Sequence, residues 1–306
     1  MPLAVACTTI SPERPQAPEL KSLRIAVTKT IDSVPLRFGV RRGLFRDAGL
    51  DIRLVESGSA AAALRAVVDG SADVGLTCNF TLLRKAAAGA QFQLQGEAYV
   101  SGENTMALVS LPGSGYDSPT DKADPVIGVE PDRGLGKLAT RMRLATEGVD
   151  PDLVTFTELR FGGMMAALRD DRIDAAWMTE PDISKAQKEF GAEVIMDTSR
   201  GALLEFPISS YAARRTRAAE HPRTFAAFRR ALAGAQALAA DLPTVRAELS
   251  RLTALDRTTV QLVSVGSYPT SLNGVRLQRV ADLMHRSGVV SERIDAASML
   301  PTPPAA

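Results

Sequence analysis

Short apolar runs alternate with helical patterns along most of this chain, and this alternation constrains the fold more than any other feature. Leu23 to Val27 is a run typical of a buried strand, and Val34 to Asp47 then repeats apolar residues four positions apart at Leu36, Val40 and Leu44. The same strand-then-helix unit recurs in both halves of the sequence. This order is typical of α/β lobes built on mostly parallel sheets.

The alternation predicts a series of elements. We expect strands at residues 23–27, 50–55, 73–76, 91–98, 105–111, 126–129, 153–157, 175–178 and 206–212. We expect helices at residues 34–47, 60–68, 81–88, 135–146 and 163–169, and over most of the chain beyond residue 212. With 306 residues, the chain is long enough to build two lobes with a sizeable buried core.

The order of the elements predicts where the chain passes between the lobes. The polar stretch from Pro112 to Pro125 is rich in Gly, Ser and Pro, and we expect the first crossing there; the strand at 206–212 makes the return. The predicted organisation is a flexible tether at 1–21, lobe I at 22–112 and 212–300, lobe II at 113–211 and a disordered tail at 301–306.

One internal similarity favours two lobes of related topology. In Ala66–Asp73 and in Ala167–Asp174, a helix ends in a polar turn and an aspartate then opens a short apolar strand. Chance is the alternative, because helix–turn–strand units often look alike. If the lobes are related, the strand ends at 79–81 and 179–181 lie on opposing walls of a cleft. Ligands of open α/β sheets bind at such carboxyl ends of strands.

The composition argues against several functional classes. Lys and Arg number 36 and Asp and Glu 35, a net charge of +1, which argues against a nucleic-acid partner. Two cysteines, Cys7 and Cys78, are too few for a disulfide framework or a thiolate metal cluster. Two histidines, His221 and His285, leave little room for histidine-based catalysis. No segment approaches the roughly 20 apolar residues of a membrane span. We expect no cofactor and no metal.

The first residues leave two interpretations of the compartment open. Met1 to Cys7 resembles the end of a bacterial lipoprotein signal, with small residues before a cysteine that would carry the lipid, but it lacks a basic region and a long apolar core. We expect a trimmed or miscalled start, with Cys7 as the lipid attachment site of an extracytoplasmic protein. If the start is the true one, the protein is cytoplasmic. Residues 8–20 are rich in Pro, Ser, Thr and Glu and suit a flexible tether.

Polar and aromatic residues follow the expected strands at four places, and they form the candidate binding site. Lys29 and Arg133, together with the backbone N–H groups at the start of the helix near residue 135, favour a small organic anion. Aromatic residues such as Phe80 and Trp177 would instead suit a heteroaromatic ring, although a core position is the commoner role of tryptophan. The candidate ligand-binding residues are Lys29, Thr30, Asp32, Asn79, Phe80, Thr81, Asp132, Arg133, Gly134, Leu135, Trp177, Thr179 and Glu180.

Motifs of enzymes are weak or missing. Gly134, Gly136 and Ala139 satisfy the dinucleotide fingerprint by letter, but residues 130–133 separate the first glycine from the strand that it should follow directly. Leu138 stands where a P-loop needs Ser or Thr. The sequence has no Gly-x-Ser-x-Gly elbow and no His-Glu-x-x-His. Nucleophilic and zinc-dependent hydrolysis are therefore not indicated.

Taken in order, several segments resemble the binding components of ABC importers of the nitrate, sulfonate, taurine and thiamine-pyrimidine-precursor type. The resemblance rests on Val34-Pro35, on Arg41–Asp51, on the Ala62–Asp73 unit, on Asp174 with Glu180-Pro181, and on the helical C-terminal third. It implies a type II periplasmic-binding-protein fold with two interlobe crossings. It also implies closure around one small-molecule solute, which is delivered to permease subunits in the membrane.

The resemblance also implies where the solute is contacted. The contacts would come from the loop after the first strand (Lys29, Thr30), from Asn79–Thr81, from Asp132–Leu135 and from Thr179–Glu180. A monomeric binding protein without catalysis is the expected function. The alternative is a cytosolic enzyme on the same scaffold, acting on a small heterocyclic or carboxylate metabolite, with Lys29 or Glu180 as a perturbed acid or base.

Overall fold

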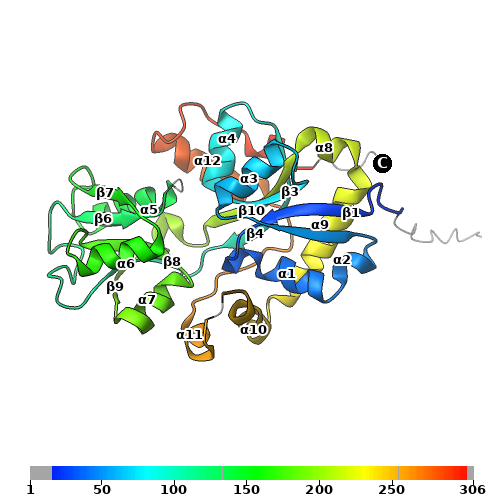
Figure 1. The fold of residues 1–306 in the computed structure, drawn as a ribbon. Coiled ribbons are helices and arrows are strands. Elements are labelled where there is room, and N and C mark those ends of the chain that lie inside the picture. The colour runs from blue at the N-terminus through cyan, green and yellow to red at the C-terminus, as the bar shows by residue number, and fades with distance from the viewer. Residues whose placement is uncertain (1–15, 132–133, 254, 302–306) are drawn as a thin grey trace, which may run out of the picture.

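The computed structural model describes residues 16–131, 134–253 and 255–301, which form two α/β lobes placed end to end (Figure 1). Each lobe is built on a five-stranded sheet. The strand order is β2-β1-β3-β10-β4 in the first sheet and β7-β6-β8-β5-β9 in the second. We name the lobes after these sheets, the first lobe and the second lobe. The predicted two-lobed α/β fold is confirmed.

The strands lie close to their predicted positions. The first sheet contains β1 (Ser22–Val27), β2 (Asp51–Glu56), β3 (Val74–Cys78), β4 (Phe92–Val100) and β10 (Pro207–Arg214). The second sheet contains β5 (Met106–Ser110), β6 (Val126–Val129), β7 (Thr155–Glu158), β8 (Ala175–Thr179) and β9 (Glu193–Asp197). Strand β9 has no counterpart among the predicted strands.

Helices cover both sheets. Those of the first lobe are α1 (Val34–Arg41), α2 (Leu44–Asp47), α3 (Ala60–Val68), α4 (Asn79–Ala87), α8 (Arg215–Glu220), α9 (Pro222–Leu238), α10 (Leu242–Thr253) and α12 (Gly274–Arg286). Those of the second lobe are α5 (Leu135–Thr146), α6 (Phe161–Arg169) and α7 (Asp182–Phe190), of which α7 was not predicted. The predicted helix at 34–47 is divided into α1 and α2, because Gly43 adopts a left-handed conformation with φ of 83°.

The two sheets share one topology, in which a single strand runs against the other four. In the first sheet β1 pairs in parallel with β2 and β3, while β10 is antiparallel to both β3 and β4. In the second sheet β6 pairs in parallel with β7 and β8, while β5 is antiparallel to both β8 and β9. In each sheet, the antiparallel strand is the first one that the chain forms after crossing from the other lobe.

The first crossing does not lie where the sequence predicted it. Strand β5 follows β4 after only residues 101–105, yet it belongs to the second sheet, so the chain has already crossed there. The polar stretch Pro112–Pro125 is a loop within the second lobe, and its composition reflects a surface position rather than a linker. The chain returns to the first lobe between β9 and β10, so all of Pro207–Arg214 belongs to the first sheet. The predicted boundary between lobes II and I at residue 212 therefore lies several residues too far along the chain.

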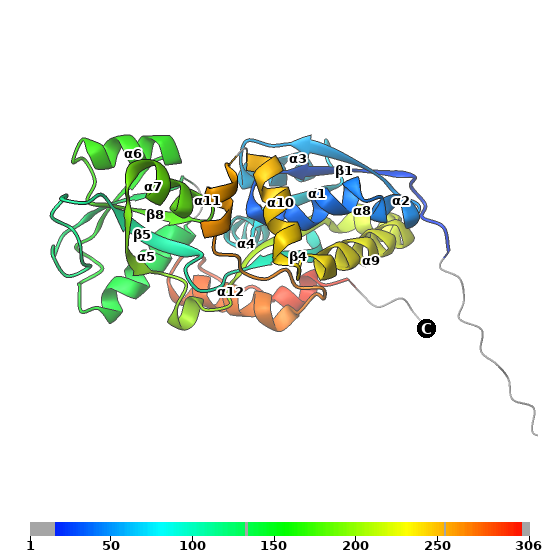
Figure 2. The ribbon, with the colours of Figure 1, turned by 90° about the horizontal axis from the view of Figure 1, so that it is seen from below.

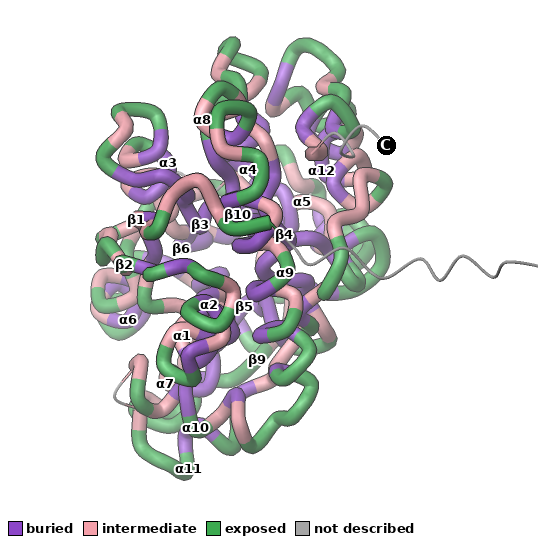
Figure 3. Tube along the Cα trace, turned by 90° about the vertical axis from the view of Figure 1, so that its right-hand side faces the viewer, coloured by how far each residue is buried: buried purple, intermediate pink, exposed green. Residues whose placement is uncertain are grey.

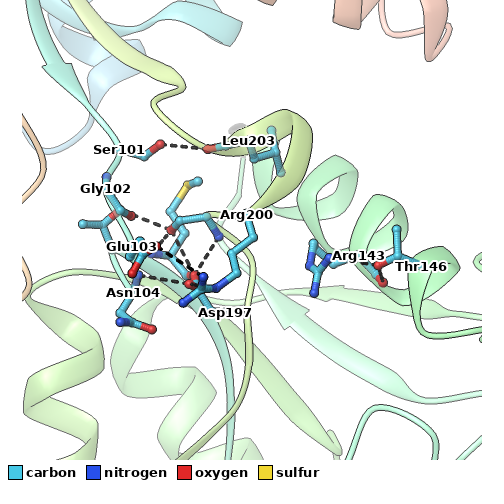
Figure 4. Close-up of polar contacts among 12 residues, drawn as sticks. Ser101, Gly102, Glu103, Asn104, Arg143, Thr146, Asp197, Arg200 and Leu203 are labelled. Atoms are coloured by element: carbon cyan, nitrogen blue, oxygen red, sulfur yellow. Dashed lines mark hydrogen bonds and ion pairs between the residues drawn. The ribbon is translucent and has the colours of Figure 1, made fainter.

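The two crossings run beside each other and are tied together by hydrogen bonds (Figure 4). The Ser101 hydroxyl donates to the Leu203 carbonyl (2.9 Å), and the Asn104 N–H donates to the Asp197 carboxylate (3.2 Å). Arg200 forms ion pairs with Glu103 (3.3 Å) and with Asp197 (2.9 Å). Residues 101–105 and 197–203 therefore act as one double-stranded connection between the lobes.

A third segment also contacts both lobes. Helix α11 (Arg257–Leu262) packs against α7 of the second lobe and against α10 of the first. Figure 2 shows α11 in orange, lying between the two lobes. Lys188 of α7 forms an ion pair with Asp256 at the start of α11 (2.5 Å). The chain then returns to the first lobe, where Ser267 and Val100 exchange two backbone hydrogen bonds of 2.9 Å. We call residues 256–267 the strap.

The internal similarity seen in the sequence corresponds to one structural role in both lobes. The Asp73 N–H donates to the Arg24 carbonyl, and its carboxylate accepts from the Arg24 N–H (2.8 and 2.9 Å). The Asp174 N–H donates to the Val126 carbonyl, and its carboxylate accepts from the Val126 N–H (2.8 and 2.7 Å). Asp73 therefore aligns β3 with β1, and Asp174 aligns β8 with β6.

The cores are apolar and continuous with the central strands. Figure 3 shows buried stretches in purple along β3, β10 and β4, and every residue of β3 is buried. Phe45 stacks on Phe228 with ring centroids 5.7 Å apart, and Tyr211 meets Phe228 edge-on at 6.1 Å, which joins α2, α9 and the sheet. Among the described residues, no helix combines the length and apolar character that a membrane crossing requires.

The predicted tether at 1–21 is too long. Residues 1–15, with Cys7, lie outside the described part, but Glu19 is fixed at the start of α9. Its carboxylate accepts from the N–H groups of Arg223 (2.9 Å) and Thr224 (2.7 Å). Burial opposes ionisation of this carboxyl, but hydrogen bonds from Thr224 and Arg223 outweigh it and lower the pKa of Glu19 to about 2. A carboxylate is favoured at a helix N-terminus, so Glu19 is held in place although the composition around it is typical of a tether.

Replacing Asp73 tests the strand alignment. Asp73→Ala leaves the Arg24 N–H without its carboxylate partner, and we expect it to lower the free energy of unfolding by about 1–3 kcal/mol. The measurement is urea-induced unfolding followed by circular dichroism. Asp69→Ala is the matched control, because Asp69 lies in the same turn but is exposed, and its carboxylate hydrogen-bonds to Ser71. Equal stability of the two variants would contradict the assigned role.

Candidate ligand-binding cleft

A cavity with a volume of about 530 Å³ lies between the lobes. The first lobe contributes residues 28–30 after β1, residues 56–61 between β2 and α3, and Thr81 of α4. The second lobe contributes Glu130 and Pro131 after β6, and Arg160 before α6. Both walls are therefore formed at the carboxyl ends of parallel strands, where open α/β sheets bind their ligands.

A second cavity of about 340 Å³ adjoins the first, since both are lined by Lys29, Thr30 and Glu130. Its remaining wall comes from Asp32, from residues 179–182 and Lys185 of the second lobe, and from the end of α10. We call the two cavities together the cleft. Their volumes are in the range of small-molecule sites.

One end of the cleft offers hydrogen-bond donors to an anion. Ser59 caps α3, because its hydroxyl accepts from the Ala62 N–H (3.1 Å). Ala60 and Ala61 also line the larger cavity, and N–H groups in the first turn have no partner within the helix. The hydroxyls of Thr28 and Thr30 lie 3.1 Å apart on the same wall. A helix N-terminus and several hydroxyls are a suitable setting for an oxyanion.

Two cations from opposite lobes line the same cavity. Lys29 and Arg160 are exposed, and neither side chain forms a hydrogen bond or an ion pair with the part of the chain that the structure describes. Of the acids that line this cavity with them, Glu56 is paired with Arg37, which binds both of its carboxylate oxygens at 2.7 and 2.9 Å; Glu130 also belongs to the lining. These hydrogen bonds hold the pKa of Glu56 below its ordinary value. Lys29 and Arg160 are thus available to a ligand.

Glu180 lies at the edge of the cleft, where donors from α7 and from the strap surround its carboxylate. Its carboxylate is buried and accepts from the Ser184 hydroxyl (2.8 Å), the Ser184 N–H (3.2 Å) and the Ser264 N–H of the strap (3.0 Å). Burial is the largest effect and raises the pKa of Glu180 above its ordinary value, although these hydrogen bonds oppose the rise. Burial against the strap and α7 therefore accounts for this shift, and the hydrogen bonds give the carboxylate a structural role.

The structure brings about half of the predicted residues to the cleft. Lys29, Thr30 and Thr81 line the larger cavity, and the smaller one is lined by Lys29, Thr30, Asp32, Thr179 and Glu180. Asp132 and Arg133 lie outside the described residues. Five others are absent from both linings: Asn79, Phe80, Gly134, Leu135 and Trp177.

These five residues have packing or capping roles. Asn79 is fully buried and donates to the Pro207 carbonyl (3.0 Å). Phe80 is 1% exposed and packs on Phe206 at 6.4 Å, while Leu135 is buried at the start of α5 and Gly134 caps that helix. Trp177 is 1% exposed, donates from Nε1 to the Thr198 hydroxyl (2.9 Å), and so belongs to the core of the second lobe.

Other cleft residues were missed by the sequence interpretation. Arg160 directly precedes α6 and follows β7 closely, a position equivalent to those that were considered after the other strands. Ser57 and Ser59 stand between a predicted strand and a predicted helix, where a serine signals an N-cap. Applying the same strand-end rule to every βα loop would have found all three.

With this geometry established, sequence comparison gives the family. The family model described as NMT1/THI5 like matches residues 30–245, more than half of the chain. This protein belongs to the NMT1/THI5-like family. No curated protein matches the chain by sequence.

Solved structures share the fold over nearly the whole chain. The alkanesulfonate-binding protein SsuA from Xanthomonas axonopodis pv. citri, bound to MOPS, superposes with a TM-score of 0.77 at 20% identity, covering 93% of this chain and 99% of that one. The aliphatic sulphonate-binding SsuA from Escherichia coli gives 0.73 at 19% identity, covering 92% and 97%. The nitrate-binding NrtA from Synechocystis PCC 6803 gives 0.67 at 16%, covering 80% and 70%. At these identities the likeness shows the fold.

The buried Glu180 carboxyl makes stability depend on pH in a stated direction. Because its pKa is raised in the folded state, the folded protein loses stability relative to the unfolded chain as pH rises from 4.5 through the folded-state pKa. Glu180→Gln cannot titrate, so the wild type should lose stability relative to this variant over that window. Urea unfolding of both proteins from about pH 4 to about pH 7.5 measures the difference.

The exposed Glu189 of α7, the helix that follows Glu180, supplies the control for this measurement. Glu189→Gln removes one carboxylate without touching the strap, and its stability should follow the wild type across the pH range. A difference between wild type and Glu180→Gln that does not change with pH would contradict the raised pKa.

Proposed function

We propose that this protein is the solute-binding component of an ABC importer, and that it binds a small organic anion between its lobes without converting it. The observation that carries the proposal is the pair of available cations, Lys29 and Arg160, which come from opposite lobes and line one cavity of about 530 Å³. An anion that contacts both would hold the lobes together, which is how a two-lobed binding protein closes on its ligand.

The ligand is best described as sulfonate-like. Two cations, the N-terminus of α3 and the hydroxyls of Thr28 and Thr30 can all donate to the oxygens of one oxyanion. The structural neighbours named for alkanesulfonate, sulphonate and nitrate binding support an oxyanion. A heteroaromatic nutrient was the other expectation. It has less support, because Phe80, Trp177 and Phe206 are each at most 1% exposed.

The proposal includes a location and a partner. A binding protein of this kind acts outside the cytoplasm and delivers its ligand to permease subunits in the membrane, as a monomer. The periplasmic neighbours support this location. Cys7, as a lipid attachment site, would place the first lobe near the membrane through the residues that precede Glu19.

A ligand screen with cleft variants tests the proposal. We expect ethanesulfonate, taurine or MOPS to stabilise the protein, since a ligand at 100 times its Kd adds about 2.7 kcal/mol to the free energy of unfolding. Lys29→Ala and Arg160→Ala should each weaken binding about tenfold to a hundredfold, because a charge-assisted hydrogen bond contributes about 1.5–3 kcal/mol. Thermal shift identifies the ligand, and isothermal titration calorimetry measures Kd.

The control is Lys85→Ala, which removes an exposed lysine of α4 that does not line the cleft. Its Kd should equal that of the wild type. If a ligand of the screen binds Lys29→Ala and Arg160→Ala as tightly as the wild type, the anion site lies elsewhere. Conversion of the bound compound, followed by mass spectrometry over hours, would favour the enzyme instead.

A further inference from the structure

A further cavity of about 230 Å³ lies in the first lobe, apart from the two that form the cleft, and shares no lining residue with them. It is enclosed by residues 95–97 of β4, by one face of α9 and by residues 269–272, which follow the strap. We propose that this cavity is a binding site for a short aliphatic monocarboxylate, held by Arg229 of α9. We call it the β4–α9 pocket.

Arg229 is the group that points to a ligand. Arg229 lines the pocket, and the single hydrogen bond of its guanidinium among the described residues goes to the neutral side chain of Gln95, at 2.8 Å. No carboxylate of the described residues forms an ion pair with it. Burial, with a smaller contribution from Arg230, lowers the pKa of Arg229 below its ordinary value. A partly buried cation without an anionic partner is costly for the fold, and an incoming anion would offset that cost.

The acid that lines the same pocket does not neutralise Arg229. Both carboxylate oxygens of Glu97 are bound by Arg276, at 2.8 and 3.0 Å, and one of them also accepts from the Asn273 N–H at 2.7 Å. Glu97 and Arg276 form a closed ion pair of no net charge. Arg229 therefore leaves the pocket with a single net positive charge, which matches a monoanion better than a dianion.

Size and lining select the class of ligand. A guanidinium offers two parallel N–H groups that match the two oxygens of a carboxylate. Leu232, Ala233, Pro269 and Leu272 form apolar parts of the wall, which suit a short hydrocarbon chain. The volume corresponds to about seven or eight water molecules at roughly 30 Å³ each, room for a carboxylate with a few carbons. A ligand there would bridge β4, α9 and the segment after the strap.

The experiment titrates the protein with butyrate and follows the side-chain amide NMR signals of Gln95 and Gln236, which both line the pocket. We expect saturable shifts in the wild type and at least a tenfold weaker Kd in Arg229→Gln. Arg230→Gln is the matched control, since it removes the same charge from the adjacent residue, which does not line the pocket. It should bind butyrate as the wild type does.

A second variant guards against a merely structural effect of Arg229. Ala233→Leu fills the pocket without changing any charge and should also abolish the shifts while the protein stays folded. The cleft variant Lys29→Ala should keep them, so this site and the proposed function can fail independently. The proposal is overturned if butyrate gives no saturable shift in the wild type. It is equally overturned if Arg229→Gln and Arg230→Gln weaken binding alike, or if Ala233→Leu still binds.

Discussion

The pairing of one strand from each half of the chain into the sheet of the other lobe is the constraint on which the rest of this structure depends. Strand β10 is hydrogen-bonded between β3 and β4, and β5 between β8 and β9. Without β10, strand β4 would have no hydrogen-bonded neighbour in the first sheet, and without β5 the same would hold for β9 in the second. Both lobes therefore need both crossings. The strand ends that carry Lys29 in the first lobe and Arg160 in the second are then held on either side of this double-stranded connection.

The electrostatics of the cleft follow from this arrangement. Two acids of the cleft have other partners: Arg37 binds Glu56, and Glu180 is bound to Ser184 and the strap. Like charges on opposite lobes favour separated lobes over distances of about 8 Å at physiological salt. On the proposed function, an oxyanion removes this repulsion and replaces it with two attractive contacts. The closed form is then favoured only with ligand bound, since a ligand shifts an equilibrium by its differential affinity.

Much of the fold could be predicted because it is written in local periodicity. Helix α5 has the predicted bounds, 135–146, and the strands of both sheets lie within a few residues of theirs, except β9. The missed elements are those whose pattern is weak: β9 is mostly exposed or half-buried, and α7 is largely polar. The first crossing was misplaced for another reason. Whether a buried strand such as β5 joins the sheet before or after it depends on long-range pairing, which periodicity does not contain.

The site was predictable where a residue's position decides its role and not where packing decides it. Lys29 and Thr30 follow β1 directly, so a strand-end rule is enough to place them at the cleft. Phe80 and Trp177 also stand near strand ends, but their large apolar surfaces are buried against Phe206 and under α5. Gly136 makes this possible, because a Cβ there would lie 2.8 Å from the Trp177 ring. Such complementarity between distant residues cannot be read from the sequence alone.

The strap limits how the lobes can move about the double crossing. Its Ser264 N–H is held by Glu180 of the second lobe, and two residues later the Gly266 N–H donates to the Tyr99 hydroxyl of the first lobe (2.6 Å). Only glycine fits at 266, since a Cβ would come within 2.1 Å of the Val100 carbonyl oxygen. One end of this short segment therefore belongs to each lobe. Any rotation that closes the cleft must be absorbed between Ser264 and Gly266 as well as in the crossings, so closure depends on three connections rather than two.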